Sequence, residues 1–384
     1  MKVLVTNCTR NTGLTMARAM ARAGWETHGA DDRHFPFGLK SRFVLAPYRR
    51  LPDEKDATFV PALLALLEQL RPDVLIPMRG VENICMQQHS VQRFTRTLLP
   101  KPGAFSVLND KSALLALCAD LGVAAPRVLS LEEAREQLRR CPGLPVVVKP
   151  CRDIGGGEGV HFIDDAEKLQ GIHEQISNAY GPALTTEYIA GPTAALRAVH
   201  LLFDADSRLI ANFVVQKLRI WPRSVGVSVA AVSVHDPELV RQIVPIFQAL
   251  KWRGPADAEL KIDPRDGKAK ILEINPRFSG MSHFPIACGV NIPLRYCRAA
   301  LGERLQEQWL PDYRAGVRFV SLARWLIALA DQVRTRPGER LQVLRQAWQQ
   351  EWHGPRVRSV HEAGDPAPIL GRALLALRRP SERR

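Results

Sequence analysis

The sequence predicts an α/β protein that opens with a doubly wound parallel-sheet domain, continues as an α+β region and ends in a helical extension. Up to about residue 108, strand-like apolar runs alternate with helical segments, which is typical of a parallel sheet covered by helices. Two later pairs of strand-like runs, within 145–163 and 256–277, are each joined by turn residues and predict antiparallel hairpins. The domain bounds expected from this pattern are 1–108, 109–310 and 311–384.

The first domain is predicted from five short segments. They are a strand at 2–6, a helix at 13–23, a strand at 25–29, a helix at 59–70 and a strand at 73–77. Ligands of such sheets bind beyond the carboxyl ends of the strands, so we expect Thr6, Asn7, Arg79 and Glu82 near a cleft. Residues 7–13 lack the GxGxxG spacing of a dinucleotide site, which argues against a nicotinamide cofactor.

Composition and charge limit the class of protein. The chain has 384 residues and a net charge of +14, and such a charge attracts polyanions. Residues 334–384 carry eleven arginines and five acidic groups, so a basic tail that binds nucleic acid stays open beside a solvated surface. No RNA-binding or helix-turn-helix motif accompanies this tail, and nucleic acid is therefore not the expected partner.

The cysteines and apolar runs point to the cytoplasm. Seven scattered cysteines form no CxxC pair, so we expect reduced thiols and no structural metal. The opening apolar run is too short for a signal peptide, and no apolar run reaches about 18 residues. We therefore expect a cytoplasmic protein without a membrane span.

A lysine and a run of glycines form a candidate phosphate site. Asp110 or Asn109 is expected to cap a helix that includes Lys111. Lys149 ends a strand, and Gly155, Gly156 and Gly157 follow before the next strand begins at Val160. Glycine allows backbone N–H groups to approach phosphate oxygens closely. A glycine-rich hairpin alone is weak evidence, because many such hairpins bind nothing.

Two later strands predict a site for a hard cation. Glu259 lies on the first strand, and Glu273 and Asn275 lie on the second. If these strands pair, the alternation of side chains puts the three oxygen ligands on one face, which suits Mg²⁺. Arg277 follows on the same face and could stabilise charge on a phosphoryl group. The alternative is that both glutamates are solvated strand residues, paired with Lys261 or Lys270.

These motifs, in this order, resemble the ATP-grasp superfamily, in the branch of carboxylate–amine ligases and carbamoyl-phosphate-synthase-like proteins. The resemblance runs from about residue 1 to 310, and Glu273-Ile-Asn-Pro-Arg277 is its strongest element. It implies an N-terminal substrate domain followed by two lobes that clasp ATP, with a lid lobe at about 126–186. It also implies ATP and Mg²⁺ as cofactors, with Mn²⁺ as an alternative metal.

The resemblance also implies roles for individual residues. Lys111 and Lys149 would contact phosphates, and the loop of Gly155, Gly156 and Gly157 would cover them. Glu187, with the backbone of Tyr188 and Ile189, would read the adenine edge. Glu259, Glu273 and Asn275 would hold Mg²⁺, and Arg277 would stabilise an acyl phosphate. Two departures from the family pattern are Glu158 in the lid loop and Thr193, where a carboxylate is common.

The implied activity is ligation: a carboxylate is activated by ATP as an acyl phosphate and joined to an amine, with release of ADP and phosphate. Carbamoyl or other acyl-phosphate transfer is an alternative on the same scaffold, and a non-catalytic nucleic-acid-binding protein is another. Small-molecule carboxylates and amines are the expected partners, and a homodimer stays open.

Candidate substrate residues lie in a basic and aromatic segment. Arg219 and Arg223 could clamp a carboxylate or phosphate, with Ser228, Lys217 and Trp221 nearby; a solvated loop is the alternative. His283 is a candidate general base, although a lone histidine is more often structural. After residue 311 the sequence predicts helices that serve packing or oligomer contacts.

Overall fold

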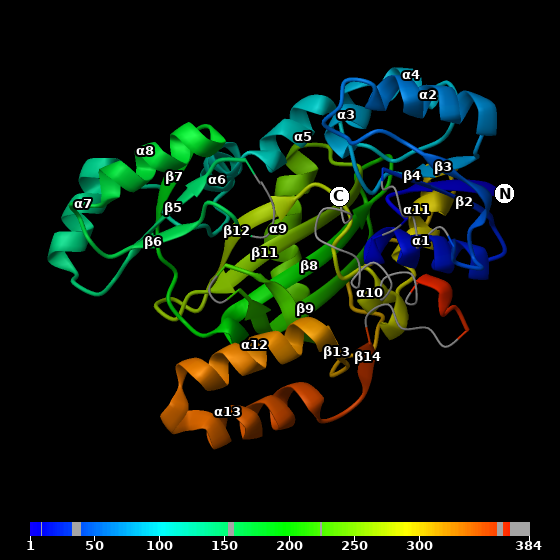
Figure 1. Ribbon diagram of the computed structural model, residues 1–384. Helices are drawn as coiled ribbons and strands as arrows, with labels where there is room; N and C mark the ends of the chain where they lie inside the picture. The colour runs from blue at the N-terminus through cyan, green and yellow to red at the C-terminus, as the bar shows by residue number, and fades with distance from the viewer. Residues whose placement is uncertain (9, 33–39, 153–156, 223–224, 359–363, 369–384) are drawn as a thin grey trace.

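The architecture comes from a computed structural model of the chain (Figure 1). It describes residues 1–8, 10–32, 40–152, 157–222, 225–358 and 364–368. In the described part of the chain, a first domain lies at one end of a long central sheet and a small lobe lies at the other (Figure 1). Two helices of the C-terminal extension run beside the sheet. In this part of the chain no helix is both long and apolar enough to cross a membrane.

The first domain is built on a parallel sheet of four strands in the order β3-β2-β1-β4. The strand–helix alternation predicted from the sequence is confirmed, and a strand that was not predicted, β3, lies at the edge. The strands are β1 (Lys2–Thr6), β2 (Glu26–Asp31), β3 (Leu45–Arg50) and β4 (Val74–Ile76), and the helices are α1 (Asn11–Arg22), α2 (Phe59–Leu70), α3 (Val81–Met86), α4 (Gln88–Gln92) and α5 (Pro102–Asn109).

A small antiparallel sheet forms the lobe at the other end, in the order β6-β5-β7. Helix α6 leads into it, and the Asp110 carboxylate caps this helix by accepting hydrogen bonds from the backbone N–H groups of Ser112 and Ala113. The elements are α6 (Lys111–Asp120), α7 (Leu131–Arg140), β5 (Val146–Pro150), β6 (His161–Ile163), α8 (Leu169–Tyr180) and β7 (Ala183–Glu187).

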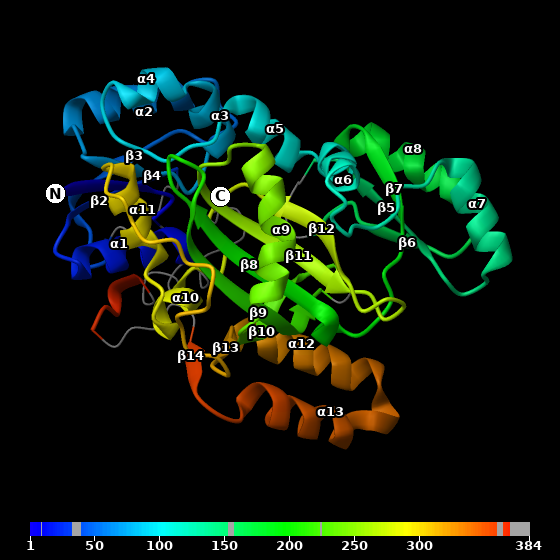
Figure 2. The ribbon, with the colours of Figure 1, turned by 180° about the vertical axis from the view of Figure 1, so that it is seen from behind.

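The central sheet has seven strands in the order β12-β11-β8-β9-β10-β13-β14. Neighbours are antiparallel except β13 and β14, which are parallel. Helix α9 crosses one face (Figure 2), and α10 and α11 pack on the other near the first domain. The elements are β8 (Leu196–Phe203), β9 (Leu209–Trp221), β10 (Val227–Val234), α9 (Pro237–Ala249), β11 (Gly254–Ile262), β12 (Ala269–Asn275), α10 (His283–Cys288) and α11 (Ile292–Ala300).

The C-terminal extension is helical, as predicted, but it also contributes two strands to the central sheet. These strands are β13 (Arg318–Val320) and β14 (Arg356–Arg358). Between them lie α12 (Leu322–Thr335), a 3₁₀ turn (Pro337–Glu339), α13 (Arg340–Ala347) and a π-helical turn (Trp348–Trp352). Three-residue strands rich in arginine carry little apolar pattern, so no strand was predicted here.

Two contacts fix the extension to the body. Trp325 of α12 packs with Val229 and Ala230 of β10 in a separate apolar cluster. Asp365 returns to the first domain, where its buried carboxylate accepts from the Arg18 guanidinium at 2.8 Å and from the Ser41 hydroxyl at 2.5 Å. The last described segment is therefore fixed to α1.

Candidate active site

A cavity of about 2210 Å³ runs between the small lobe, the central sheet and the C-terminal extension. Most residues predicted for nucleotide, metal and substrate binding line it. They are Lys111, Lys149, Gly157, Glu187, Tyr188, Ile189, Arg219, Ser228, Glu259, Glu273, Asn275 and Arg277. The predicted residues Gly155, Gly156 and Arg223 lie outside the described part of the chain.

The predicted metal ligands come together on β11 and β12. Glu259 and Glu273 are directly paired residues of the two strands, and Asn275 is paired with Asp257. The Asn275 amide nitrogen lies 3.4 Å from the Glu273 carboxylate. The pairing puts two carboxylates and one amide oxygen on one face, as the alternation of the sequence predicted.

Three lysines surround these carboxylates. The Lys217 ammonium lies 2.6 Å from the Glu259 carboxylate, and that of Lys111 lies 3.4 Å from Glu273. Lys149 donates to the Leu272 carbonyl at 3.3 Å. Lys217 was weighed in the sequence only as part of the substrate segment. Lys217 lies on β9, two residues before Arg219, and its contact with Glu259 shows that both side chains are on the same face of the central sheet.

Burial and mutual repulsion set the charge state of this cluster. Burial, with the nearby Lys111 ammonium, lowers the pKa of Lys149 to about 8. Burial raises the pKa of Glu273, but the Lys111 and Lys149 ammoniums outweigh it and hold this pKa below its usual value. Burial raises the pKa of Glu259. These pKa shifts describe a cluster in which each carboxylate needs a nearby lysine to stay charged.

A buried acid, a buried histidine and a half-buried histidine beside the predicted metal ligands were not predicted together. Asp257 pairs with His200 on β8, and its carboxylate lies 3.4 Å from the His200 ring. Burial raises the pKa of Asp257 to about 6 and lowers that of His200 to about 3. His283 lines the cavity with a pKa lowered by burial to about 4. The alternation of Asp257 with Glu259 was the available signal for the acid.

Arg277 lies at the end of β12, as predicted, and faces the same group of residues. Its guanidinium donates to the Asn275 side-chain oxygen at 3.0 Å. It also lies close enough to Asp257 to lower that residue's pKa against the effect of burial. The guanidinium therefore sits where a carboxylate or phosphoryl oxygen in the cavity can reach it.

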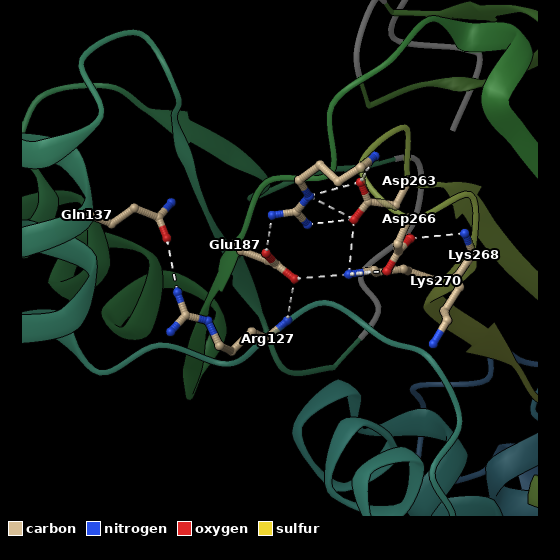
Figure 3. A network of polar contacts seen from close by, with 8 residues as sticks. Arg127, Gln137, Glu187, Asp263, Asp266, Lys268 and Lys270 are labelled. Carbon is tan, nitrogen blue, oxygen red and sulfur yellow. Dashed lines mark hydrogen bonds and ion pairs between the residues drawn. The ribbon is translucent and has the colours of Figure 1, made fainter.

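Glu187 is held by a network of ion pairs at the edge of the cavity (Figure 3). Its carboxylate accepts from Arg265 at 2.9 Å and from the Arg127 backbone N–H at 3.0 Å, and lies 3.6 Å from Lys270. These contacts commit both side-chain oxygens of Glu187. The backbone of Tyr188 and Ile189, which lines the cavity, is the part of this segment left for a ligand.

Arg219, predicted as a substrate clamp, contacts a carboxylate of the protein itself. Its Nη2 lies 2.9 Å from Glu351 and its Nε 3.0 Å from the same group. Gln332 accepts from Nη1, and the Trp325 indole donates to Glu351. Both members of the ion pair are nearly buried, with side chains 11% and 3% exposed. In this arrangement Arg219 binds the C-terminal extension to the central sheet.

The residues predicted near a cleft in the first domain divide between two places. Thr6, Asn7 and Arg79 line a separate small pocket, where Arg79 pairs with Asp32 at 2.5 Å. Glu82 lies 3.3 Å from Arg152, which lines the large cavity. The first domain contributes three other residues to that cavity, Arg10, Asn11 and Thr12.

The two sequence departures also lie at the cavity. Glu158 is exposed and accepts a hydrogen bond from the Tyr180 hydroxyl at 3.3 Å. Thr193 opens a 3₁₀ turn (Thr193–Ala195) on the wall.

The donors at this site fit a divalent cation and a triphosphate. Within the described ranges, no group of three or more His, Cys, Asp or Glu side chains is arranged to hold a metal ion. Glu259, Glu273 and Asn275 instead supply three oxygen ligands, which suits a cation that keeps water and phosphate in its shell. The lysines that pair with the carboxylates in this structure are the groups to which a triphosphate would bind.

Comparisons with known proteins agree with this geometry. A family model described as ATP-grasp in the biosynthetic pathway with Ter operon matches residues 214–324. D-aspartate ligase of Enterococcus faecium (strain Aus0004) is 22% identical over 264 residues, which are 62% of this chain and 62% of that protein. The chain thus matches about three fifths of the length of this curated relative.

Solved structures share the fold at low identity. Biotin carboxylase of Campylobacter jejuni has a TM-score of 0.64 at 17% identity, covering 83% of this chain and 74% of that chain. N5-carboxyaminoimidazole synthetase of Staphylococcus aureus, complexed with ADP, has a TM-score of 0.61 at 16% identity, covering 80% and 78%. The chain therefore shares the fold of these solved structures, and residues 214–324 within that fold match an ATP-grasp family model.

Proposed function

We propose that the chain is an ATP-dependent ligase that joins a carboxylate to an amine. The observation that carries this proposal is the pairing of Glu259 with Glu273 on adjacent strands, beside Asn275, with Lys111, Lys149 and Lys217 around them in one cavity. Such a site balances the charge of a metal–triphosphate complex. The similarity to a protein named D-aspartate ligase supports the ligase class.

In this proposal the residues have separate roles. Lys111 and Lys149 hold phosphate oxygens, and the backbone of Tyr188 and Ile189 binds the adenine edge. Glu259, Glu273 and Asn275 would hold Mg²⁺, which when bound offsets charge on the phosphate oxygens. Arg277 holds the reacting carboxylate close to the γ-phosphate by its two-pronged guanidinium.

The reaction needs no covalent bond to the protein. A carboxylate oxygen attacks the γ-phosphorus of ATP and the bond to ADP breaks. The amine nitrogen then attacks the acyl carbon, the bond to phosphate breaks, and the amine loses a proton. In the first step Lys111 and Lys149 stabilise the negative charge on the phosphate oxygens. In the second step Arg277 stabilises the charge on the acyl oxygens.

The test is a pairwise screen of amines and carboxylates for release of ADP. Acidic amino acids, D- and L-aspartate among them, are the first carboxylates to pair with other amino acids and short peptides. The proposal requires ADP release that depends on both members of a pair and an amide product detected by mass spectrometry. A carbamoylated or phosphorylated product without an amide would favour the alternative of acyl-phosphate transfer. ADP release that no pair stimulates would contradict ligation.

A further inference from the structure

The cavity continues beyond the proposed reaction site along the C-terminal extension. Helix α12 lines it with Arg324, Ala328 and Gln332, which are spaced four residues apart, and Arg336 lines it directly after the helix ends. Residues at this spacing follow one side of a helix. Gln346, Gln350, Trp352 and Arg356 line the same part of the cavity. We call this region, from Arg324 to Arg356, the distal chamber.

The size of the cavity exceeds what a nucleotide and a small acid require. Pockets for small molecules measure about 300–1000 Å³, whereas this cavity measures about 2210 Å³. The excess volume is open to the reaction site, because the same continuous cavity is lined by Glu273 and by Arg336. A second substrate with its reacting group at Arg277 can therefore extend into the distal chamber.

The charge of the distal chamber is positive. Arg324 has no ion-pair partner among the residues that the structure describes. Arg336 pairs with the exposed Glu339, at 3.2 Å, and Arg356 lies over the Trp352 ring at 4.5 Å from its centroid. Glu351, the acid that lines this wall in the described part of the chain, is neutralised by Arg219. The guanidinium groups of Arg324, Arg336 and Arg356 thus give the distal chamber its positive charge.

The spacing of these arginines favours an extended ligand. Arg336 directly follows α12 and lies twelve positions after Arg324, a span of about 18 Å at 1.5 Å per residue of helix. A compact anion cannot reach both ends of this row. Between the arginines, the amide side chains of Gln346 and Gln350 line the cavity, and amides both donate to and accept from a peptide backbone.

We propose that the distal chamber binds the second substrate of the ligase, and that this substrate is an acidic oligopeptide. The inference deepens the proposed function and rests on it: the peptide end that reacts lies at Arg277, and its carboxylates pair with Arg324, Arg336 and Arg356. The Arg219–Glu351 ion pair holds the chamber wall on the central sheet and leaves these three arginines for the peptide.

The experiment measures binding of a hexapeptide of L-glutamate, carrying a fluorophore at its C-terminus, by fluorescence anisotropy at fixed low salt. The chamber variant combines Arg324→Gln, Arg336→Gln and Arg356→Gln. The matched control combines Arg334→Gln, Arg340→Gln and Arg345→Gln, which are exposed residues that do not line the cavity. Both variants remove three positive charges, so long-range attraction falls equally.

The proposal predicts at least tenfold weaker binding for the chamber variant and less than twofold weaker binding for the control. Equal weakening in both variants, or no binding by the wild-type chain, would overturn it. A fluorescent single-stranded oligonucleotide is measured in parallel; if it binds tighter than the peptide and responds more to the chamber variant, the ligand is nucleic acid instead. If the triple variant misfolds, peptide binding is measured instead with the single change Arg324→Glu, which is at an exposed position.

Failure of this inference can be separated from failure of the proposed function. Thermal stabilisation by Mg-ATP reports the nucleotide site, and it should survive in the chamber variant. A Glu273→Gln variant should lose that stabilisation yet bind the hexapeptide as the wild type does. Equal weakening of peptide binding in the chamber and control variants, with intact nucleotide stabilisation, contradicts the chamber alone. Absent nucleotide stabilisation in the wild type contradicts the ligase.

Discussion

The carboxylates of Glu259 and Glu273 lie opposite each other on β11 and β12, and each has its own ammonium partner, Lys217 at 2.6 Å and Lys111 at 3.4 Å. Two half-buried carboxylates so close together repel each other unless cations lie beside them. Here the lysines supply that charge. In the proposed function, a divalent cation would bind the two carboxylates and the phosphates of a nucleotide would bind the lysines.

The first prediction concerns the carboxylate of Glu273. Glu273→Gln keeps the shape of the side chain but removes a charged ligand, a loss worth about 3 kcal/mol or roughly a hundredfold in rate. ADP release in the presence of an active substrate pair should fall by about that factor. Glu82→Gln, an exposed change in the first domain, serves as the control and should leave the rate within about twofold.

The second prediction concerns the pH dependence of nucleotide binding. Burial and the nearby Lys111 lower the pKa of Lys149 from 10.5 to about 8, so its charge is lost as the pH rises through 8. Nucleotide affinity, measured by calorimetry between pH 7 and 9, should therefore fall with rising pH. Lys149→Arg keeps the charge throughout and should flatten the curve. A wild-type affinity that stays constant over this range would contradict the role of Lys149.

The same shift has a consequence for stability without nucleotide. Between pH 8 and about 10.5 the unfolded chain keeps a proton on Lys149 that the folded protein has released. The contribution of Lys149 to the free energy of unfolding should then rise with pH in this window. Chemical denaturation of the wild type and of Lys149→Met at pH 8 and pH 10 measures the difference.

The third prediction concerns Gly157 in the turn before β6. Its φ is +79°, and a Cβ at this position would overlap the carbonyl oxygen of Val225. Gly157→Ala should therefore move the turn away from β10 and weaken nucleotide binding by about tenfold, since strained backbone at such a site costs ~1–3 kcal/mol. Gly171→Ala, in helix α8 with open space around it, is the matched control. Equal affinities in both variants would show that the turn does not touch the nucleotide.

The fourth prediction concerns the ion pair of Arg219 with Glu351. Glu351→Ala leaves a buried guanidinium without its carboxylate, which should lower the free energy of unfolding by about 3 kcal/mol. Replacing both residues by leucine removes the unpaired charge and should cost less than Glu351→Ala alone. Urea denaturation of the three proteins measures this difference. If Arg219 instead served only as a substrate clamp, Glu351→Ala would leave stability unchanged.

The sequence predicted most elements that carry the site. Period-two alternation identified β11 and β12, and the pairing of Glu259 with Glu273 followed from it. The sequence could not predict contacts between distant segments. Glu351 lies 132 residues from Arg219, and no local pattern links them. For the same reason the distal chamber was missed. Arg336 and Arg356 appeared in the sequence only as members of a basic tail, and the strands that bring this tail to the sheet are three residues long.

The ion pairs of Glu187 were not indicated by the sequence. The resemblance implied that this residue reads adenine, which stays a prediction, and in the structure its carboxylate is engaged by Arg265, Lys270 and the Arg127 N–H. Those partners lie in a turn, on β12 and in a loop, and the packing of the small lobe against β12 brings them to Glu187. Side-chain partners of this kind follow from tertiary structure, which the spacing of motifs does not encode.

If Glu259, Glu273 and the surrounding lysines bind a metal nucleotide, ATP should stabilise the protein only when Mg²⁺ and the Glu273 carboxylate are both present. Thermal unfolding of the wild type and of Glu273→Gln, each with ATP and Mg²⁺ and with ATP and EDTA, measures this. We expect ATP with Mg²⁺ to raise the Tm of the wild type by several degrees, and EDTA or the Glu273→Gln change to abolish this rise. A rise of the same size in all four samples would contradict this expectation.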